Sequence, residues 1–139
     1  MALINFFSED VDFKLARPKK IVLWIKSAVA AEKRKVKLLN IIFCSDDYLI
    51  KINKQYLNHK TLTDIITFDQ SEDPLLLEGD IFISIPRVRD NATKFKVTLN
   101  DELHRVIIHG VLHLIGYGDK SNSSKKQMRE KEDAYLSLR

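Results

Sequence analysis

The sequence contains one long apolar stretch in which two histidines are the only polar residues, and glycines follow where that stretch ends. It reads Val106-Ile107-Ile108-His109-Gly110-Val111-Leu112-His113-Leu114-Ile115-Gly116-Tyr117-Gly118-Asp119. A helix that is apolar on all sides is a buried helix, and Gly116 is a typical C-terminal helix cap. The stretch therefore predicts a central buried helix from about residue 99 to residue 115, around which the rest of the fold is built.

The two histidines of this helix have the spacing of metal ligands. His109 and His113 are four residues apart, so they lie on one face of the helix about one turn apart. Gly116 ends the helix, Gly118 keeps the next stretch pliable, and Asp119 can return as a third ligand. Three protein ligands leave one coordination position open for water, as in catalytic zinc sites. We expect one Zn²⁺ per chain, bound by His109, His113 and Asp119.

His104 provides an internal comparison for this assignment. It precedes His109 by five residues, which places it roughly 140° around the helix. The helical geometry therefore predicts that His104 is not a ligand.

The flanking segments predict strands and helices that alternate early in the chain and helices that cluster late. Strands are expected at residues 2–7, 11–15, 36–44, 64–68 and 79–85, and the other helices at residues 18–33, 45–56, 86–96 and 125–138. This order is typical of an α+β fold. We expect a single domain over residues 1–139, with a small mixed β-sheet packed against about five helices.

Composition excludes several classes of protein. The chain has 139 residues, 45% of them apolar and 30% charged, which indicates a globular protein. The single cysteine, Cys44, excludes an internal disulfide framework and a cysteine-rich zinc site. No apolar run approaches the roughly 18 residues of a membrane span, and the N-terminus lacks the pattern of a signal peptide. A cytoplasmic protein without membrane association is expected.

Positive charge is concentrated in residues 17–37. This segment holds eight basic residues and one acid, Glu32, so its formal charge is +7. The whole chain has a net charge of +4, and the residues outside the segment therefore sum to −3. Such a stretch can attract phosphates, although it can equally be the solvated face of a helix. The candidate RNA-binding residues are Lys33, Arg34, Lys35 and Lys37.

The segment His109–Tyr117 resembles the signature of the YbeY family of bacterial rRNA maturation factors. Three further segments are similar to that family in the same order along the chain. They are Asn53-x-x-Tyr56 with Thr63-Asp64-Ile65-Ile66-Thr67-Phe68, then Gly79-Asp80-Ile81, and then Met128-x-x-x-Glu132-x-x-x-Leu136. The resemblance covers most of the chain.

The resemblance implies a function and partners. The chain would be a metal-dependent endoribonuclease that cleaves single-stranded RNA, notably at the 3′ end of small-subunit rRNA. It would act in the cytoplasm in association with the small ribosomal subunit, with zinc as its cofactor and without a DNA substrate. Asp64 and Asp80 match family positions, which makes them candidates to support the metal site or the substrate.

Two positions depart from the family pattern. The family usually ends its motif with Gly-Tyr-Asp-His, whose histidine is the third ligand, whereas this chain has Gly118 and Asp119 in the last two places. Either Asp119 is the third ligand or the site has two protein ligands. Where the family has a Tyr-Arg pair, this chain has Tyr56-Leu57. The sequence does not identify a general base.

Two other functions remain open on the sequence alone. The spacing His-x-x-x-His-x-x-Gly-x-x-Asp is similar to that of metzincin proteases, which indicates a metallopeptidase-like hydrolase as one alternative. Gly110 argues against it, because those enzymes carry a glutamate general base after the first histidine. The second alternative is a non-catalytic ribosome-assembly factor with a structural metal.

Overall fold

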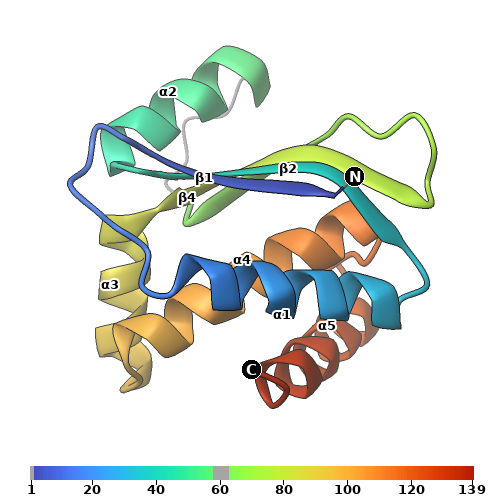
Figure 1. Cartoon of the computed structure of the whole chain (residues 1–139). Coiled ribbons are helices and arrows are strands. Elements are labelled where there is room, and N and C mark those ends of the chain that lie inside the picture. The colour runs from blue at the N-terminus through green and yellow to red at the C-terminus, as the bar shows by residue number, and fades with distance from the viewer. Residues whose placement is uncertain (1, 58–62) are drawn as a thin grey trace.

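The computed structural model describes residues 2–57 and 63–139, and in that part of the chain five helices and four strands form (Figure 1). Their order is β1 (Leu3–Glu9), α1 (Pro18–Ala31), β2 (Lys35–Cys44), α2 (Asp46–Leu57), β3 (Ile65–Asp69), β4 (Leu76–Ser84), α3 (Ile85–Phe95), α4 (Leu99–Ile115) and α5 (Asn122–Leu136).

The four strands form one mixed sheet in the order β1-β2-β4-β3. The pairs β1–β2 and β2–β4 are parallel, whereas β3 and β4 form an antiparallel hairpin. Strand β3 is therefore an edge strand, and residue 64 lies just before its first residue. The prediction of an α+β fold with a small mixed sheet and five helices is confirmed.

Side-chain alternation along the strands divides the core between two faces of the sheet. Leu39, Ile41 and Phe43 of β2 are buried in the larger cluster, together with apolar residues of α1 and α4. The opposite face carries a smaller cluster that includes Cys44 and Leu49 and lies under α2. Figure 1 shows the same division, with α2 on one side of the sheet and α1, α4 and α5 on the other.

Helix α4 is the central helix of the larger layer. Thr98 caps its N-terminus, because the threonine side chain accepts a hydrogen bond from the backbone N–H of Asp101 at 3.1 Å. Helices α3 and α5 both pack against α4, and α4 itself packs on β3 and β4. The predicted central buried helix is therefore present with the expected bounds.

The predicted strand at residues 11–15 is wrong. The backbone turns at Asp10, whose φ of 56° is left-handed, and the segment that follows runs as an irregular loop. Phe13 packs edge-on against Phe43, with ring centroids 5.1 Å apart. Apolar alternation here reflects a loop folded over the core and not strand pairing.

Candidate metal centre

Helix α4 brings His109 and His113 together on one of its faces. Their Nε2 atoms lie 3.0 Å apart and their ring centroids 4.5 Å apart. Both side chains keep part of their surface accessible, 22% for His109 and 27% for His113, although the helix around them is buried. The ring nitrogens are therefore open to a ligand on one side.

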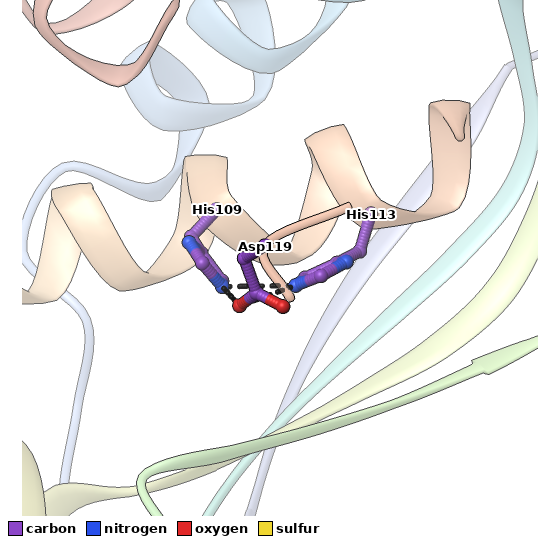
Figure 2. Close-up of side chains that lie close together, drawn as sticks. All are labelled: His109, His113 and Asp119. Carbon is purple, nitrogen blue, oxygen red and sulfur yellow. Dashed lines mark hydrogen bonds and ion pairs between the residues drawn. The ribbon is translucent and has the colours of Figure 1, made fainter. Parts of the chain in front are cut away.

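The chain after α4 returns to the histidines because the helix ends abruptly. Gly116 has a φ of 123°, a conformation that L side chains rarely adopt. The N–H of Tyr117 donates to the Leu112 carbonyl at 3.0 Å and holds the turn close to the helix end. Asp119 then lies beside both rings, with its Oδ2 3.3 Å from each Nε2 (Figure 2).

The three atoms form a triangle that suits a metal ion. Its edges are 3.0, 3.3 and 3.3 Å, and these three residues form a group that could hold an ion. Tetrahedral zinc with bonds of about 2.0–2.1 Å spaces its ligand atoms about 3.3–3.4 Å apart. The set of two imidazoles and one carboxylate therefore fits a divalent ion with one position left for water or substrate.

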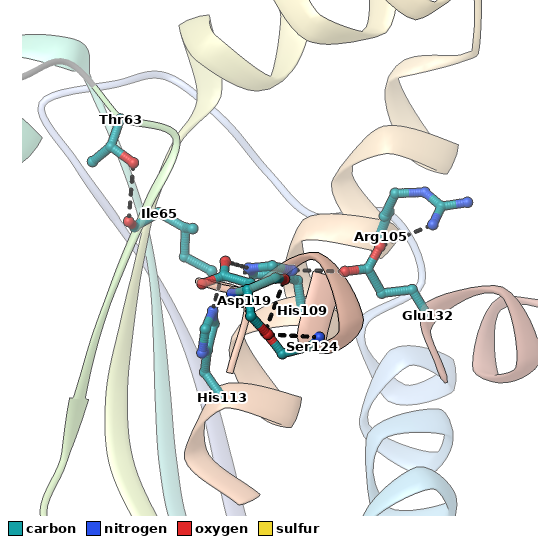
Figure 3. A network of polar contacts seen from close by, with 9 residues as sticks. Thr63, Ile65, Arg105, His109, His113, Asp119, Ser124 and Glu132 are labelled. Atoms are coloured by element: carbon teal, nitrogen blue, oxygen red, sulfur yellow. Dashed lines mark hydrogen bonds and ion pairs between the residues drawn. The ribbon is translucent and has the colours of Figure 1, made fainter. Parts of the chain in front are cut away.

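Glu132 of α5 fixes the orientation of His109 from the opposite side of the ring. Its Oε2 lies 2.6 Å from Nδ1, and its Oε1 accepts a hydrogen bond from Arg105 at 2.9 Å (Figure 3). Because the carboxylate accepts the Nδ1 proton, Nε2 keeps its lone pair for a metal. Glu132 was not predicted as a site residue. The helical repeat of Met128, Glu132 and Leu136, which places this carboxylate on the core-facing side of α5, is the signal in the sequence that points to it.

The metal loop, residues 116–120, is fastened to the rest of the molecule through Tyr117. The Tyr117 hydroxyl donates to Glu32 Oε1 at 2.5 Å, and Lys131 Nζ lies 3.0 Å from Glu32 Oε2. Tyr135 donates to the same Oε2. Burial raises the pKa of Glu32, but these three donors outweigh burial and hold the pKa below its ordinary value.

Several carboxylates lie around the cluster and shift the pKa of His109. Burial lowers the pKa of His109, but the hydrogen bond and charge of Glu132 outweigh it, helped by Asp119 and Asp64, so the pKa lies above the ordinary value of 6.5. Burial raises the pKa of Asp64 above the ordinary aspartate value. Negative charge is therefore concentrated where a cation would bind.

A cavity of about 330 Å³ opens beside the cluster. Its charged and ligand residues are Asp64, Glu102, Arg105, His109, Asp119, Lys125, Arg129 and Glu132. The cavity provides space for a substrate group next to His109 and Asp119. Asp64 is thus brought to the predicted site.

Asp80 is not brought to the site. It lies on β4 between Gly79 and Ile81, which face α4, so its own side chain points to the opposite side of the sheet. There it accepts a hydrogen bond from Asn40 at 3.0 Å. The alternation of strand side chains explains the placement, and Asp80 is left out of the proposed site.

His104 lies apart from the cluster, as helical geometry predicted. Its ring faces Trp24, with centroids 5.8 Å apart, and its Nδ1 accepts a hydrogen bond from Arg139 at 2.8 Å. The side chain of Leu57, at the end of α2, lies outside the described residues.

The four candidate RNA-binding residues lie where α1 connects to β2. Lys33, Lys35 and Lys37 are exposed, and Arg34 is half-buried. A cavity of about 390 Å³ is lined there by Lys26, Arg34, Lys35 and Lys37. The Nε of Arg34 is buried and has no hydrogen-bond partner among the residues that the structure describes.

Position 110 faces the sheet and not the metal cluster. A Cβ atom on Gly110 would lie 2.8 Å from Ile65 Cδ1 and 3.0 Å from Ile81 Cγ2. A glutamate general base of the metzincin type has no space here. Separately, no helix in residues 2–57 and 63–139 combines the length and apolarity needed to cross a bilayer.

Comparison with known proteins identifies the family. The family model described as Endoribonuclease YbeY matches residues 4–138. The Endoribonuclease YbeY of Cytophaga hutchinsonii is 52% identical over 136 residues, which cover 98% of this chain and 95% of that protein. The Endoribonuclease YbeY of Amoebophilus asiaticus is 49% identical, with 97% of this chain and 92% of that protein covered.

A solved structure agrees with this result. The solution structure of a Thermotoga maritima protein superposes with a TM-score of 0.70 at 30% sequence identity. The match covers 96% of this chain and 87% of that chain. Because the family model, the relatives and the shared fold agree over nearly the whole chain, the chain belongs to the YbeY endoribonuclease family.

Proposed function

We propose that this protein is a zinc-dependent endoribonuclease that cleaves single-stranded RNA. Its substrate is the 3′ region of small-subunit rRNA, and it acts in the cytoplasm on the small ribosomal subunit. The observation that carries the proposal is the open triangle of His109, His113 and Asp119 on the wall of a cavity. Membership of the YbeY family supports the reaction class.

Zinc fits the donor set better than the harder divalent ions. Mg²⁺ and Ca²⁺ prefer oxygen ligands, whereas imidazole nitrogens suit zinc and its transition-metal neighbours. When bound, zinc would supply Lewis-acid chemistry toward a phosphate oxygen and would lower the pKa of water.

The chain's own residues have separable tasks in this proposal. His109, His113 and Asp119 bind the ion, and Glu132 holds the proton on His109 Nδ1. Lys125 and Arg129 on the cavity wall offset the negative charge of an incoming phosphate. Asp64 borders the same space and shapes where the scissile phosphate can lie.

The basic residues at the α1–β2 connection would bind the RNA backbone. Within the described part of the chain, the cavity lined by Lys26, Arg34, Lys35 and Lys37 has no acidic side chain in its lining. Lys37 Nζ forms an ion pair with Glu78 Oε1 at 3.4 Å. Because this pair is exposed to solvent, it contributes little to stability. A phosphate would also provide an acceptor for the buried Nε of Arg34.

An assay with two substrates and a chelator tests this function against both alternatives. We expect cleavage of single-stranded RNA that a chelator stops, with unfolded casein left intact. Metal-dependent proteolysis with intact RNA would favour the peptidase. Stoichiometric metal binding without cleavage of either substrate would favour the assembly factor.

Three variants locate the activity within the molecule. His109→Ala and His113→Ala remove ligands, and we expect both to lose metal and RNA cleavage. His104→Ala is the matched control for metal content, since it removes a histidine from the same helix outside the cluster. Full metal content in His109→Ala, measured by elemental analysis, would contradict the proposed site.

A further inference from the structure

A second cavity of about 640 Å³ lies on the other side of α4, between the N-terminal part of α1 and the C-terminal end of the chain. Its lining includes Arg17, Lys20, Trp24, Asn100, His104 and Arg139. We propose that this cationic pocket binds a phosphate of the same RNA strand that is cleaved at the metal centre. The inference rests on the proposed function and extends the substrate site beyond the ligands.

The pocket is positively charged because Arg17, Lys20 and Arg139 line it, and none of its lining residues within 2–57 and 63–139 is an aspartate or glutamate. In residues 2–57 and 63–139, Arg17 and Lys20 form no ion pair. Arg139 is held in place by Asp101, with Nη1 3.0 Å from the carboxylate. Two uncompensated cations therefore border one hollow, and such sites concentrate phosphate anions.

The neutral groups of the pocket also favour an acceptor such as phosphate. An arginine can only donate hydrogen bonds, so the contact of 2.8 Å from Arg139 makes His104 Nδ1 the acceptor. The imidazole proton is then on Nε2, which remains a donor. Burial and the charge of Arg139 both lower the pKa of His104, which agrees with a neutral ring.

The pocket and the metal-site cavity both adjoin a third hollow between α4 and α5. This third hollow shares Glu102, Arg105 and Arg129 with the metal-site cavity. It shares Leu136 and Arg139 with the cationic pocket. The three hollows therefore follow one another along α4 and α5, and we call this row of hollows the α4–α5 groove.

The charges of the α4–α5 groove change along its length. In the middle, Asp133 pairs with Arg105 at 2.7 Å, and Asp101 pairs with Arg139. Near the metal, Lys125 and Arg129 form no ion pair among the described residues. Because carboxylates also line the metal end, the cationic pocket is the part of the groove that would hold a phosphate without a bound cation.

Trp24 makes the pocket directly observable. It is the only tryptophan in the sequence and lies in the pocket wall. The experiment titrates chelator-treated, metal-free protein with a labelled oligoribonucleotide long enough to span the groove, and follows both fluorescence anisotropy and tryptophan emission. Because no cleavage is needed, a lack of nuclease activity would not affect this result.

Lys20→Glu and Lys19→Glu form a matched pair. Both reverse one charge at neighbouring positions of α1, but only Lys20 lines the pocket. We expect Lys20→Glu to weaken RNA binding and to abolish the change in tryptophan emission. The slope of log affinity against log salt concentration should become shallower by about 0.7 for each phosphate that is no longer neutralised. Lys19→Glu should behave like the wild type, and Lys20→Gln should show the same effects as Lys20→Glu in smaller measure.

Zinc-loaded protein gives a second readout. Lys20→Glu should raise KM severalfold for the long RNA with kcat and metal affinity unchanged, and it should leave a dinucleotide substrate unaffected. Equal affinity, emission and KM in Lys20→Glu and Lys19→Glu would overturn the proposal. A Lys20-dependent emission change with inorganic phosphate but none with RNA would also overturn it, because the pocket would then be a site for small anions only.

Discussion

At the residue scale, one carboxylate of α5 controls what His109 can do. Glu132 is buried and bonds the histidine through one oxygen and Arg105 through the other. A buried carboxylate needs such partners. Sequence periodicity could place Glu132 on the inner face of its helix, but only the packing of α5 on α4 brings it to a particular nitrogen of His109.

Removing the charge of Glu132 should weaken metal binding. Glu132→Gln leaves a side chain of the same size that no longer stabilises the His109 proton, so metal affinity should fall about 10–100-fold. Competition with a chelating dye measures this affinity. Asp133→Asn is the control, because Asp133 also binds Arg105 but does not contact a histidine; an equal loss in both variants would contradict the role of Glu132.

The same contact makes the metal-free protein pH-sensitive. The pKa of His109 is raised, so the protonated form is the one that the fold stabilises. This stability is fully present below the unfolded pKa of about 6.5 and is lost as pH rises through the higher folded pKa. NMR titration should place the His109 pKa above 6.5 in the wild type and lower in Glu132→Gln, and an unchanged pKa in the variant would contradict this account.

At the element scale, α4 lies so close to the sheet that position 110 has no space for a side chain. An alanine Cβ would lie 2.8 Å from Ile65 Cδ1, closer than real Cβ contacts, and 3.0 Å from Ile81 Cγ2, closer than most of them, so the Ile65 side chain would have to shift. From the sequence, Gly110 indicated only that this position carries no general base. Its packing role depends on which strands lie beneath α4, which local patterns do not specify.

Gly110→Ala should therefore be destabilising in spite of the higher helix propensity of alanine. Overpacking costs about 1–3 kcal/mol, against a gain of about 1 kcal/mol from propensity. Ile65→Val removes the methyl group that lies nearest to the new Cβ. The double variant should therefore be more stable, by about 0.5–3 kcal/mol, than the sum of the two single effects predicts. Urea denaturation of the four proteins in the cycle measures the coupling, and simple additivity would refute the close approach.

At the scale of the whole molecule, the metal centre is assembled from distant parts of the chain. Strand order places β3 at the sheet edge beside α4, which brings Asp64 to the cavity, whereas alternation sends Asp80 to the other face. The sequence predicted both histidines and Asp119, because helical spacing and a short loop connect them locally. It did not separate Asp64 from Asp80, because that distinction depends on register in the sheet.

Glu32 connects three of these parts, the end of α1, the metal loop and α5. Tyr117→Phe removes the hydroxyl that fastens the metal loop to Glu32. The free energy of unfolding should fall by about 0.5–1.5 kcal/mol. Metal affinity should fall severalfold. Tyr135→Phe removes another donor to Glu32 without touching the metal loop. It should lose stability but keep metal affinity, and an equal loss of affinity in both variants would argue against the anchoring role of Tyr117.

The central claim is that a single ion held by His109, His113 and Asp119 makes this chain an RNA-cleaving enzyme. The most direct measurement titrates Zn²⁺ into the metal-free protein and follows bound metal and single-stranded RNA cleavage in the same samples. We predict that cleavage rises with bound zinc and reaches its plateau at one ion per chain. Asp119→Ala should shift both curves to higher zinc concentration together. Cleavage by the metal-free protein, or full occupancy of the three-ligand site without cleavage, would contradict the account.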